Sequence, residues 1–306
     1  MQAGAAVQGK ATGAILVGAT LIGFSAIFVK WAVAGGATTL TVGFYRMLVA
    51  LPGAWWLARR TGALGAGRGR AWAIAAGGAL AIDLALWHAS MHLTTAANAT
   101  LLVGGLSPIW VALFSYFALG RRTGALGWLG QLAGLAGALV LALARGAHGS
   151  GGGRGEAIAI VASFCYAAFT LALSRARATL DAPQALFWMS LTCLVGFAIA
   201  ATAAGDPFSG YDRRAWASLV GLGVVVQLVA WWLCSWGLGH VEAAVGALGL
   251  QMQQVATPFL AAWLLAEPLR PLGLLGGGLL VAGIVLVSLG SARAAARPSR
   301  SPTAPP

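Results

Sequence analysis

Residues 96–110 read AANATLLVGGLSPIW, and residues 242–260 read EAAVGALGLQMQQVATPFL. Each stretch is long and apolar, and each contains a proline preceded by a hydroxyl residue, Pro108 in the first and Pro258 in the second. Proline inside an apolar helix is uncommon enough that its recurrence in a similar context indicates a relationship between the two stretches. The chain therefore contains two related segments about half its length apart.

A second pair of similar segments follows the first. Residues 132–143 read LAGLAGALVLAL and residues 278–289 read GLLVAGIVLVSL. Gly137 in the first stretch corresponds to Gly283 in the second. The longest glycine-rich break, residues 145–155, lies between the two copies and almost at the middle of the chain. These positions predict an internal duplication.

The composition of the 306 residues places the chain in a membrane. Hydrophobic residues make up 59% of it and charged residues only 8%, whereas a soluble globular protein carries about 25% charged residues. So little charge excludes a soluble enzyme, a disordered protein and a coiled coil. The main solvent of this chain is expected to be lipid.

The apolar stretches are long enough to cross a bilayer, which takes about 20 residues. They lack the strict alternation of barrel strands, so they are predicted to be helices. Five lie on each side of the central break, and because five is odd, the second set enters the membrane upside down. The sequence thus predicts an all-α integral membrane protein of ten transmembrane helices in two inverted five-helix repeats, spanning residues 13–34, 38–58, 71–92, 94–118, 125–144, 156–177, 184–204, 214–237, 241–266 and 271–290.

These boundaries divide the chain into four parts. Residues 1–146 form the first repeat, residues 147–155 a glycine-rich linker and residues 156–290 the second repeat. Residues 291–306, rich in Arg, Pro, Ser and Ala, have no apolar period and are predicted to be a disordered basic tail.

The net charge of +12 is interpreted as a sign of how the chain is oriented in the membrane, rather than of nucleic-acid binding. With the N-terminus in the cytoplasm, twelve Lys and Arg residues lie in cytoplasmic segments, six lie outside and Arg46 is within a span. Cytoplasmic loops are rich in Lys and Arg, so both termini are predicted to be cytoplasmic, in a bacterial inner membrane. The lipid bilayer is the partner that the composition implies, and no nucleic acid is expected.

Several short motifs recur in both halves and cover nearly the whole chain: Thr95-Ala96-Ala97-Asn98-Ala99, Pro108, Gly120-Arg121-Arg122 and Gly130, Gly134 and Gly137, then Glu242-Ala243-Ala244, Pro258, Ala266-Glu267-Pro268 and Gly283. Together they resemble the EamA-type proteins of the drug/metabolite transporter superfamily. The family pattern has a glutamate at one point of each half. In the first half Arg121 replaces it, and in the second half Glu267 is present. The resemblance implies a secondary transporter that works by alternating access, with the first, third, fourth, sixth, eighth and ninth spans around a central cavity.

A narrower resemblance concerns the third span. Trp87-His88, with Met91 one turn later, is similar to the aromatic-histidine pattern of YddG-type amino-acid exporters. It implies the export of amino acids, aromatic or otherwise apolar. The alternatives are carriers of nucleotide sugars, phosphorylated metabolites or drugs, a lipid-flipping protein and a non-transporting membrane scaffold.

Ionisable side chains in the bilayer are costly and are functional candidates by default. Asp83 and His88 are five residues apart on one helix, so they point about 140° apart and only one is expected to face the cavity. Arg46 has three interpretations: binding a substrate carboxylate, pairing structurally with Asp83, or snorkelling to the membrane interface. Both Arg46 and Asp83 are thus structural or coupling candidates.

Amide and aromatic side chains in the spans complete the predicted substrate site. Amides inside a bundle either join helices or hydrogen-bond a polar ligand, and aromatic residues can form the cavity walls. The predicted substrate-binding residues are Trp87, His88, Met91, Asn98, Tyr166, Phe169, Gln227, Trp231, Gln251 and Gln254.

Other residues are predicted to serve helix bending and helix packing. Pro108 and Pro258 each remove a helix hydrogen bond and are predicted to be paired hinges. Glycines recur every three or four residues in the fifth and tenth spans, which predicts close helix packing.

The sequence lacks the motifs of an enzyme. It contains neither H-E-x-x-H nor G-x-S-x-G, and its four histidines are too few for a di-iron oxidase. We therefore expect no catalytic residues, no cofactor and no metal. The expected partner in solution is a small molecule, and the protein is expected to function as a monomer.

Overall fold

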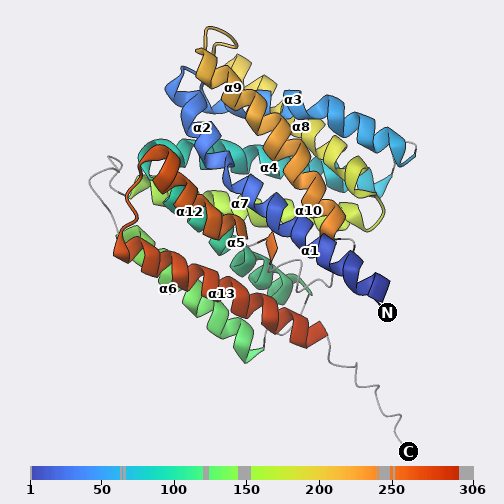
Figure 1. Ribbon diagram of the computed structural model, residues 1–306, viewed down its shortest axis with the longest axis vertical. Coiled ribbons are helices and arrows are strands. Elements are labelled where there is room, and N and C mark those ends of the chain that lie inside the picture. The colour runs from blue at the N-terminus through green and yellow to red at the C-terminus, as the bar shows by residue number, and fades with distance from the viewer. Residues whose placement is uncertain are drawn as a thin grey trace, which may run out of the picture.

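A chain of helices makes up the computed structural model (Figure 1), which describes residues 2–62, 64, 67–119, 124–143, 153–238, 240, 249–250 and 252–295. The helices are α1 (Gln2–Gly23), α2 (Ser25–Ala34), α3 (Thr39–Arg60), α4 (Arg68–Leu93), α5 (Ala96–Leu119), α6 (Ala125–Leu143), α7 (Arg154–Arg177), α8 (Ala182–Ala203), α9 (Arg213–Gly221), the π-helix η1 (Leu222–Ala230), α10 (Trp231–Leu238), α12 (Met252–Leu265) and α13 (Pro271–Ala295).

Ten helical segments of the described chain correspond to the ten predicted spans. The first segment is α1 with α2, which meet at a break at Phe24, and the eighth is α9, η1 and α10 without interruption. Within the described residues, five stretches are each long and apolar enough to cross a membrane: Gly9–Ala34, Arg68–Leu93, Arg154–Arg177, Ala182–Ala203 and Arg213–Cys234. The predicted all-α membrane fold is confirmed.

The helix contacts follow the pattern of two halves exchanged by a two-fold axis. The second, fourth and fifth spans each pack on their own counterparts, as α3 on α8, α5 on α12 and α6 on α13. The third span packs on the sixth, as α4 on α7, and the eighth packs correspondingly on the first, as α9 and α10 on α2 and α1. Such reciprocal packing is what inverted repeats require.

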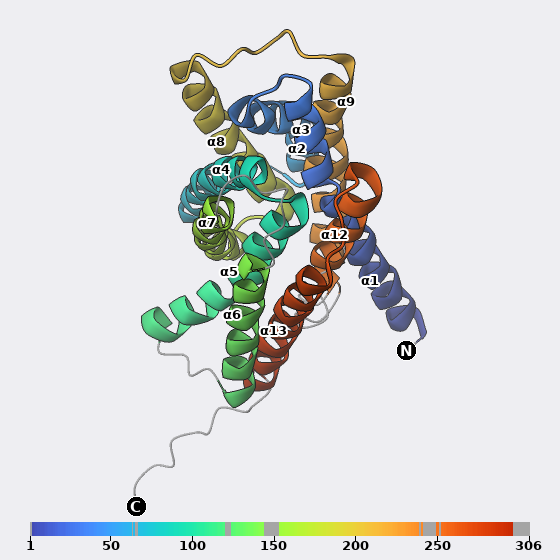
Figure 2. The ribbon, with the colours of Figure 1, turned by 90° about the vertical axis from the view of Figure 1, so that its left-hand side faces the viewer.

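The contact between α6 and α13 repeats almost atom for atom. A Cβ on Gly137 would lie 2.6 Å from the Gly276 carbonyl oxygen and 2.6 Å from the Leu280 nitrogen. One on Gly283 would lie 2.6 Å from the Gly130 oxygen and 2.6 Å from the Gly134 nitrogen. All three pairs of equivalent positions are 146 residues apart (283 − 137, 280 − 134 and 276 − 130). The glycines therefore allow the two backbones to touch, at the end of the molecule opposite α8 and α9 (Figure 2).

Arginine and tryptophan pair at the helix ends. Arg59 and Arg60 lie over the rings of Trp55 and Trp56, at 5.3 and 4.1 Å from the ring centroids. The rings of both tryptophans are about half exposed. Amphipathic rings beside cations are typical of the interface between membrane and water.

Two predicted boundaries differ from the structure or lie beyond it. α13 continues to Ala295, five residues into the predicted tail, because Ser291–Ala295 are small residues and one Arg that extend the helix without a breaker. Residues 296–306 lie outside the described part of the chain. So does most of the predicted linker, since α7 begins at Arg154.

Candidate functional site

A cavity of about 60 Å³ lies at the centre of the helix bundle. Eight helices contribute to it, from both halves of the chain: α1, α2, α3, α4, α5, α7, α12 and the segment formed by η1 and α10. This central cavity is lined by Ile22, Ser25, Arg46, Leu80, Asp83, Leu84, Trp87, Thr100, Val103, Gly104, Tyr166, Gln227, Trp231, Gln253 and Gln254.

Two irregular helices position polar side chains in the central cavity. The first span breaks at Phe24, where the Thr257 hydroxyl donates to the Gly23 carbonyl at 3.3 Å, and Ser25 follows the break. The eighth span is π-helical around Gln227. Breaks and π-helical turns free backbone groups in a membrane, and they are tolerated where polar partners are at hand.

Arg46 extends across the central cavity from α3. Its Nε donates to Gln227 Oε1 at 2.9 Å, and its Nη1 donates to the Ser25 hydroxyl at 3.0 Å. No ion pair within 4.0 Å joins Arg46 to Asp83, although both are described and both are buried. The interpretation in which Arg46 pairs with Asp83 is therefore wrong, because the guanidinium is held by neutral oxygens on α2 and η1 instead.

Unpartnered polar atoms converge on the central cavity. Of the nine buried side-chain atoms without a hydrogen-bond partner in the described chain, five belong to its lining: Asp83 Oδ1, Trp87 Nε1, Thr100 Oγ1, Gln227 Nε2 and Gln254 Oε1. A buried polar atom without a partner costs about 1–3 kcal/mol. So many in one place indicate a site for a polar guest that supplies both donors and acceptors.

Five of the ten predicted substrate-binding residues meet in the central cavity. Trp87, Tyr166, Gln227, Trp231 and Gln254 all line it, together with Arg46 and Asp83. Of the two ionisable candidates on α4, Asp83 is therefore the one that lines the central cavity.

His88 lies elsewhere. Its side chain is fully buried, and Nδ1 is 3.1 Å from the Thr39 carbonyl oxygen on α3. It is not part of the central lining, so its prediction as a cavity residue is corrected: the 140° offset from Asp83 turns it toward α3.

Three further predicted residues are also absent from the central lining. Met91 is buried in the core between the helices. Phe169 lies behind the wall, with its ring centroid 5.4 Å from that of Tyr166 and 6.4 Å from that of Trp231. Asn98 lines a second cavity. Gln251, also predicted, lies outside the described residues.

Ser25 and Thr100 also line the central cavity, although neither was predicted from the sequence. Both are small hydroxyl residues in apolar spans, and such residues often satisfy themselves on their own helix. The only signal was the position of Ser25 two residues after Gly23 and that of Thr100 two residues after Asn98.

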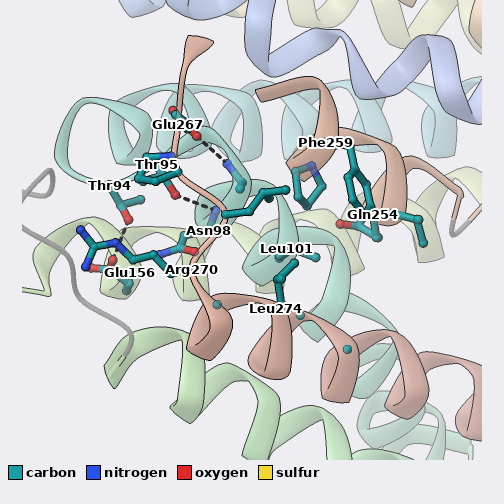
Figure 3. Close-up of a pocket in the computed structure, with 18 of the residues that line it drawn as sticks. Thr94, Thr95, Asn98, Leu101, Glu156, Gln254, Phe259, Glu267, Arg270 and Leu274 are labelled. Carbon is teal, nitrogen blue, oxygen red and sulfur yellow. Dashed lines mark hydrogen bonds between the residues drawn. The ribbon is translucent and has the colours of Figure 1, made fainter. Parts of the chain in front are cut away.

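A larger cavity of about 330 Å³ lies between α5, α12 and α13 (Figure 3). We call it the peripheral cavity. Its wall is mainly apolar, with Leu101, Phe259 and Leu274 along it, while Arg270 extends beside Glu156 and Thr94 at one end. The hinge candidate Pro258 lies in this wall, inside α12. Position 108 lies in α5, and its side chain is outside the described part.

Glu267 ties three elements together at the end of the peripheral cavity. Its Oε1 accepts from Lys30 Nζ at 2.8 Å and from the Ala96 N–H at 3.1 Å, and its Oε2 accepts from the Ala97 N–H at 3.4 Å. A carboxylate at a helix N-terminus also complements the helix dipole. The one glutamate that keeps the family pattern therefore caps α5 and joins it to α2.

We expect Glu267→Gln to cost about 1–2 kcal/mol of stability, because it removes charge-assisted bonds to two backbone N–H groups as well as the ion pair. Lys30→Gln removes only the partly exposed ion pair and should cost at most about 1 kcal/mol. Thermal unfolding in detergent, with the exposed Lys10→Gln as control, measures both. Equal losses for the two variants would contradict the capping role.

Metal ligands do not cluster in the described part of the chain, where no group of three or more His, Cys, Asp or Glu side chains could hold an ion. The site is thus built from one cation, one carboxylate, amides, hydroxyls and aromatic rings.

Comparisons with known proteins bear directly on this arrangement. The model of the EamA-like transporter family matches residues 10–143 and again residues 153–289, once in each half. No curated protein matches significantly. A solved structure titled "Crystal structure of protein" matches with a TM-score of 0.59 and 24% identity, over 90% of this chain and 98% of that one, which shows a shared fold. The chain belongs to the EamA-like transporter family of the drug/metabolite transporter superfamily, and it is a multi-pass membrane transporter rather than an enzyme.

Proposed function

We propose that this transporter carries amino acids with apolar or aromatic side chains, and that the substrate binds as a zwitterion in the central cavity. The carboxylate binds at Arg46 and the ammonium binds at Asp83. The observation that carries the proposal is that these opposite charges line one cavity without pairing with each other. A guest with both charges satisfies both groups, and leaving a buried charge unpaired is costly.

The remaining lining suits the rest of such a substrate. Trp87, Tyr166 and Trp231 provide aromatic wall, and two unpartnered groups, the Thr100 hydroxyl and Gln227 Nε2, supply further hydrogen bonds. A site of about 60 Å³ holds a few waters, so the halves must move apart to admit a side chain. That movement fits alternating access between inverted repeats.

The rival substrates fit this lining less well. A phosphorylated metabolite or nucleotide sugar calls for several buried cations, and Arg46 is the one in the described lining. A lipophilic drug cation would leave Arg46 unpaired. The amino-acid proposal also agrees with the resemblance to YddG-type exporters, which the family match by itself leaves open.

Orientation and direction are part of the same proposal. The Arg excess at the last turn of α3, at the first turn of α4 and after α13 favours cytoplasmic termini, with export across a bacterial inner membrane by a monomer. In that orientation the peripheral cavity opens at the outer face, where the links from α4 to α5 and from α12 to α13 lie. Pro258 and Pro108 would be its hinges.

Uptake into proteoliposomes with a panel of labelled amino acids, with and without a pH gradient, tests the proposal. We expect apolar and aromatic amino acids to be transported and to compete with one another. If no amino acid is transported or competes, the proposed substrate class is wrong.

We expect Arg46→Gln to weaken amino-acid binding by about 10–100-fold, since a hydrogen bond to a charged group is worth about 1.5–3 kcal/mol. Arg59→Gln is the matched control, because Arg59 is exposed and lies over the Trp55 ring. Equilibrium binding to the purified protein measures the effect. If Arg46→Gln and Arg59→Gln bind the amino acid equally well, Arg46 does not bind the substrate.

A further inference from the structure

Gln254 lies between the two cavities. Within the described chain it is the one residue that lines both the central and the peripheral cavity. Its side chain is buried, although one of the two neighbouring spaces is large and opens toward a helix end. A substrate that passes between the cavities on this route has to pass this amide.

The amide of Gln254 is seated on Gly104. A Cβ at Gly104 would lie 1.5 Å from Gln254 Nε2 and 2.5 Å from Cδ, so the amide occupies the place that any larger residue would fill. Gly104 therefore provides a seat on α5 that only glycine offers.

Gly104 and Gln254 are equivalent positions of the two repeats, each four residues before its proline, Pro108 or Pro258. Their helices, α5 and α12, are counterparts that pack on each other, so the two positions meet at the pseudo-two-fold axis. Two long side chains cannot share that place. The glycine in one half leaves room for the glutamine of the other, and the barrier is contributed by the second repeat alone.

The seated amide is only partly held. Gln254 Oε1 is buried without a hydrogen-bond partner, so moving it to a position where it meets water or a polar guest regains a bond. We propose that Gln254 is the gate between the peripheral and central cavities, and that its side chain swings off Gly104 to let the substrate pass. This inference concerns the path and does not depend on the substrate being an amino acid.

Thiol labelling tests the gate without any substrate. In a background whose three natural cysteines are replaced by alanine, one reporter is Thr100→Cys, which lies in the central cavity only, and the other is Asn98→Cys, which lies in the peripheral cavity only. A small membrane-impermeant methanethiosulfonate is added to proteoliposomes. We expect the Asn98→Cys reporter to react quickly in every variant.

Gln254→Ala should raise the labelling rate of the Thr100→Cys reporter about tenfold, as expected if the opening equilibrium shifts by about 1.4 kcal/mol. Gly104→Ala should also raise it by unseating the amide, and it should add nothing once Gln254 is alanine. Trp263→Ala, on the exposed side of α12, and Gly78→Ala, with open space around it, should leave the rate unchanged. An unchanged rate in Gln254→Ala, while the Asn98→Cys reporter still reacts quickly, would overturn the proposal.

Discussion

Asp83→Asn is expected to reduce transport at least about 100-fold without lowering the melting temperature of the protein. The substitution preserves shape and leaves an oxygen that can accept hydrogen bonds, so only the charge is lost. That charge is what an ammonium group recognises in a site from which water is largely excluded. The loss corresponds to about 2.7 kcal/mol of binding free energy.

Stability should change in the opposite direction from function. The Asp83 carboxylate is buried, one of its oxygens has no partner and no cation lies within ion-pair distance. Removing an uncompensated buried charge is often neutral or stabilising. A purely structural aspartate would instead lose stability on substitution. Transport assays combined with thermal unfolding in detergent separate the two roles.

Asp181→Asn is the matched control for Asp83→Asn. Asp181 is exposed at the start of α8, and its side chain makes no capping hydrogen bond. Both transport and melting temperature should stay near those of the parent protein. Retained transport in Asp83→Asn would show that the carboxylate does not bind substrate.

The second large effect is expected at the contact of α6 with α13. Gly137→Ala would place a methyl group 2.6 Å from a backbone oxygen, and no side-chain movement can relieve that clash. Overpacking of this kind typically costs about 1–3 kcal/mol. Because the surroundings of Gly283 are equivalent, Gly283→Ala should cost nearly the same, within about 0.5 kcal/mol.

Gly78→Ala serves as the control for the glycine pair. A Cβ at Gly78 meets nothing within 4 Å, and alanine is the better helix former by up to about 1 kcal/mol. We therefore expect Gly78→Ala to be neutral or stabilising in the same thermal unfolding assay. If Gly137→Ala unfolds at the temperature of Gly78→Ala, the close packing described for α6 and α13 is wrong.

The architecture could be predicted from the sequence because two of its signals are strong. Long apolar stretches have few alternatives in lipid, and the spacing of glycines in the fifth and tenth spans pointed to the backbone contact now seen at Gly137 and Gly283. The amides Gln227 and Gln254 of the central cavity were predictable for a related reason, because an amide in an apolar span needs a polar partner inside the bundle. Aromatic residues were harder to place from the sequence, since Trp263 is exposed on α12 and Phe169 lies outside the central lining.

The orientation of individual side chains was harder to predict. α4 is apolar on nearly every face, so nothing in its pattern said whether Asp83 or His88 faces the centre. The outcome depends on tertiary contacts, because His88 Nδ1 lies within hydrogen-bond distance of the Thr39 carbonyl oxygen on α3. Similarly, only the fold reveals that Ser25 and Gln227 hold the guanidinium of Arg46.

The central claim is that Arg46 binds the carboxylate of a zwitterionic substrate and Asp83 binds its ammonium group. The most direct measurement is equilibrium binding of the best-transported amino acid, its methyl ester and its N-acetyl derivative. The parent protein should bind both derivatives at least about 10-fold more weakly, since each loses one charged hydrogen-bonding group. Arg46→Gln should no longer discriminate against the ester, nor Asp83→Asn against the N-acetyl form. Equal binding of all three compounds to the parent protein would contradict the account.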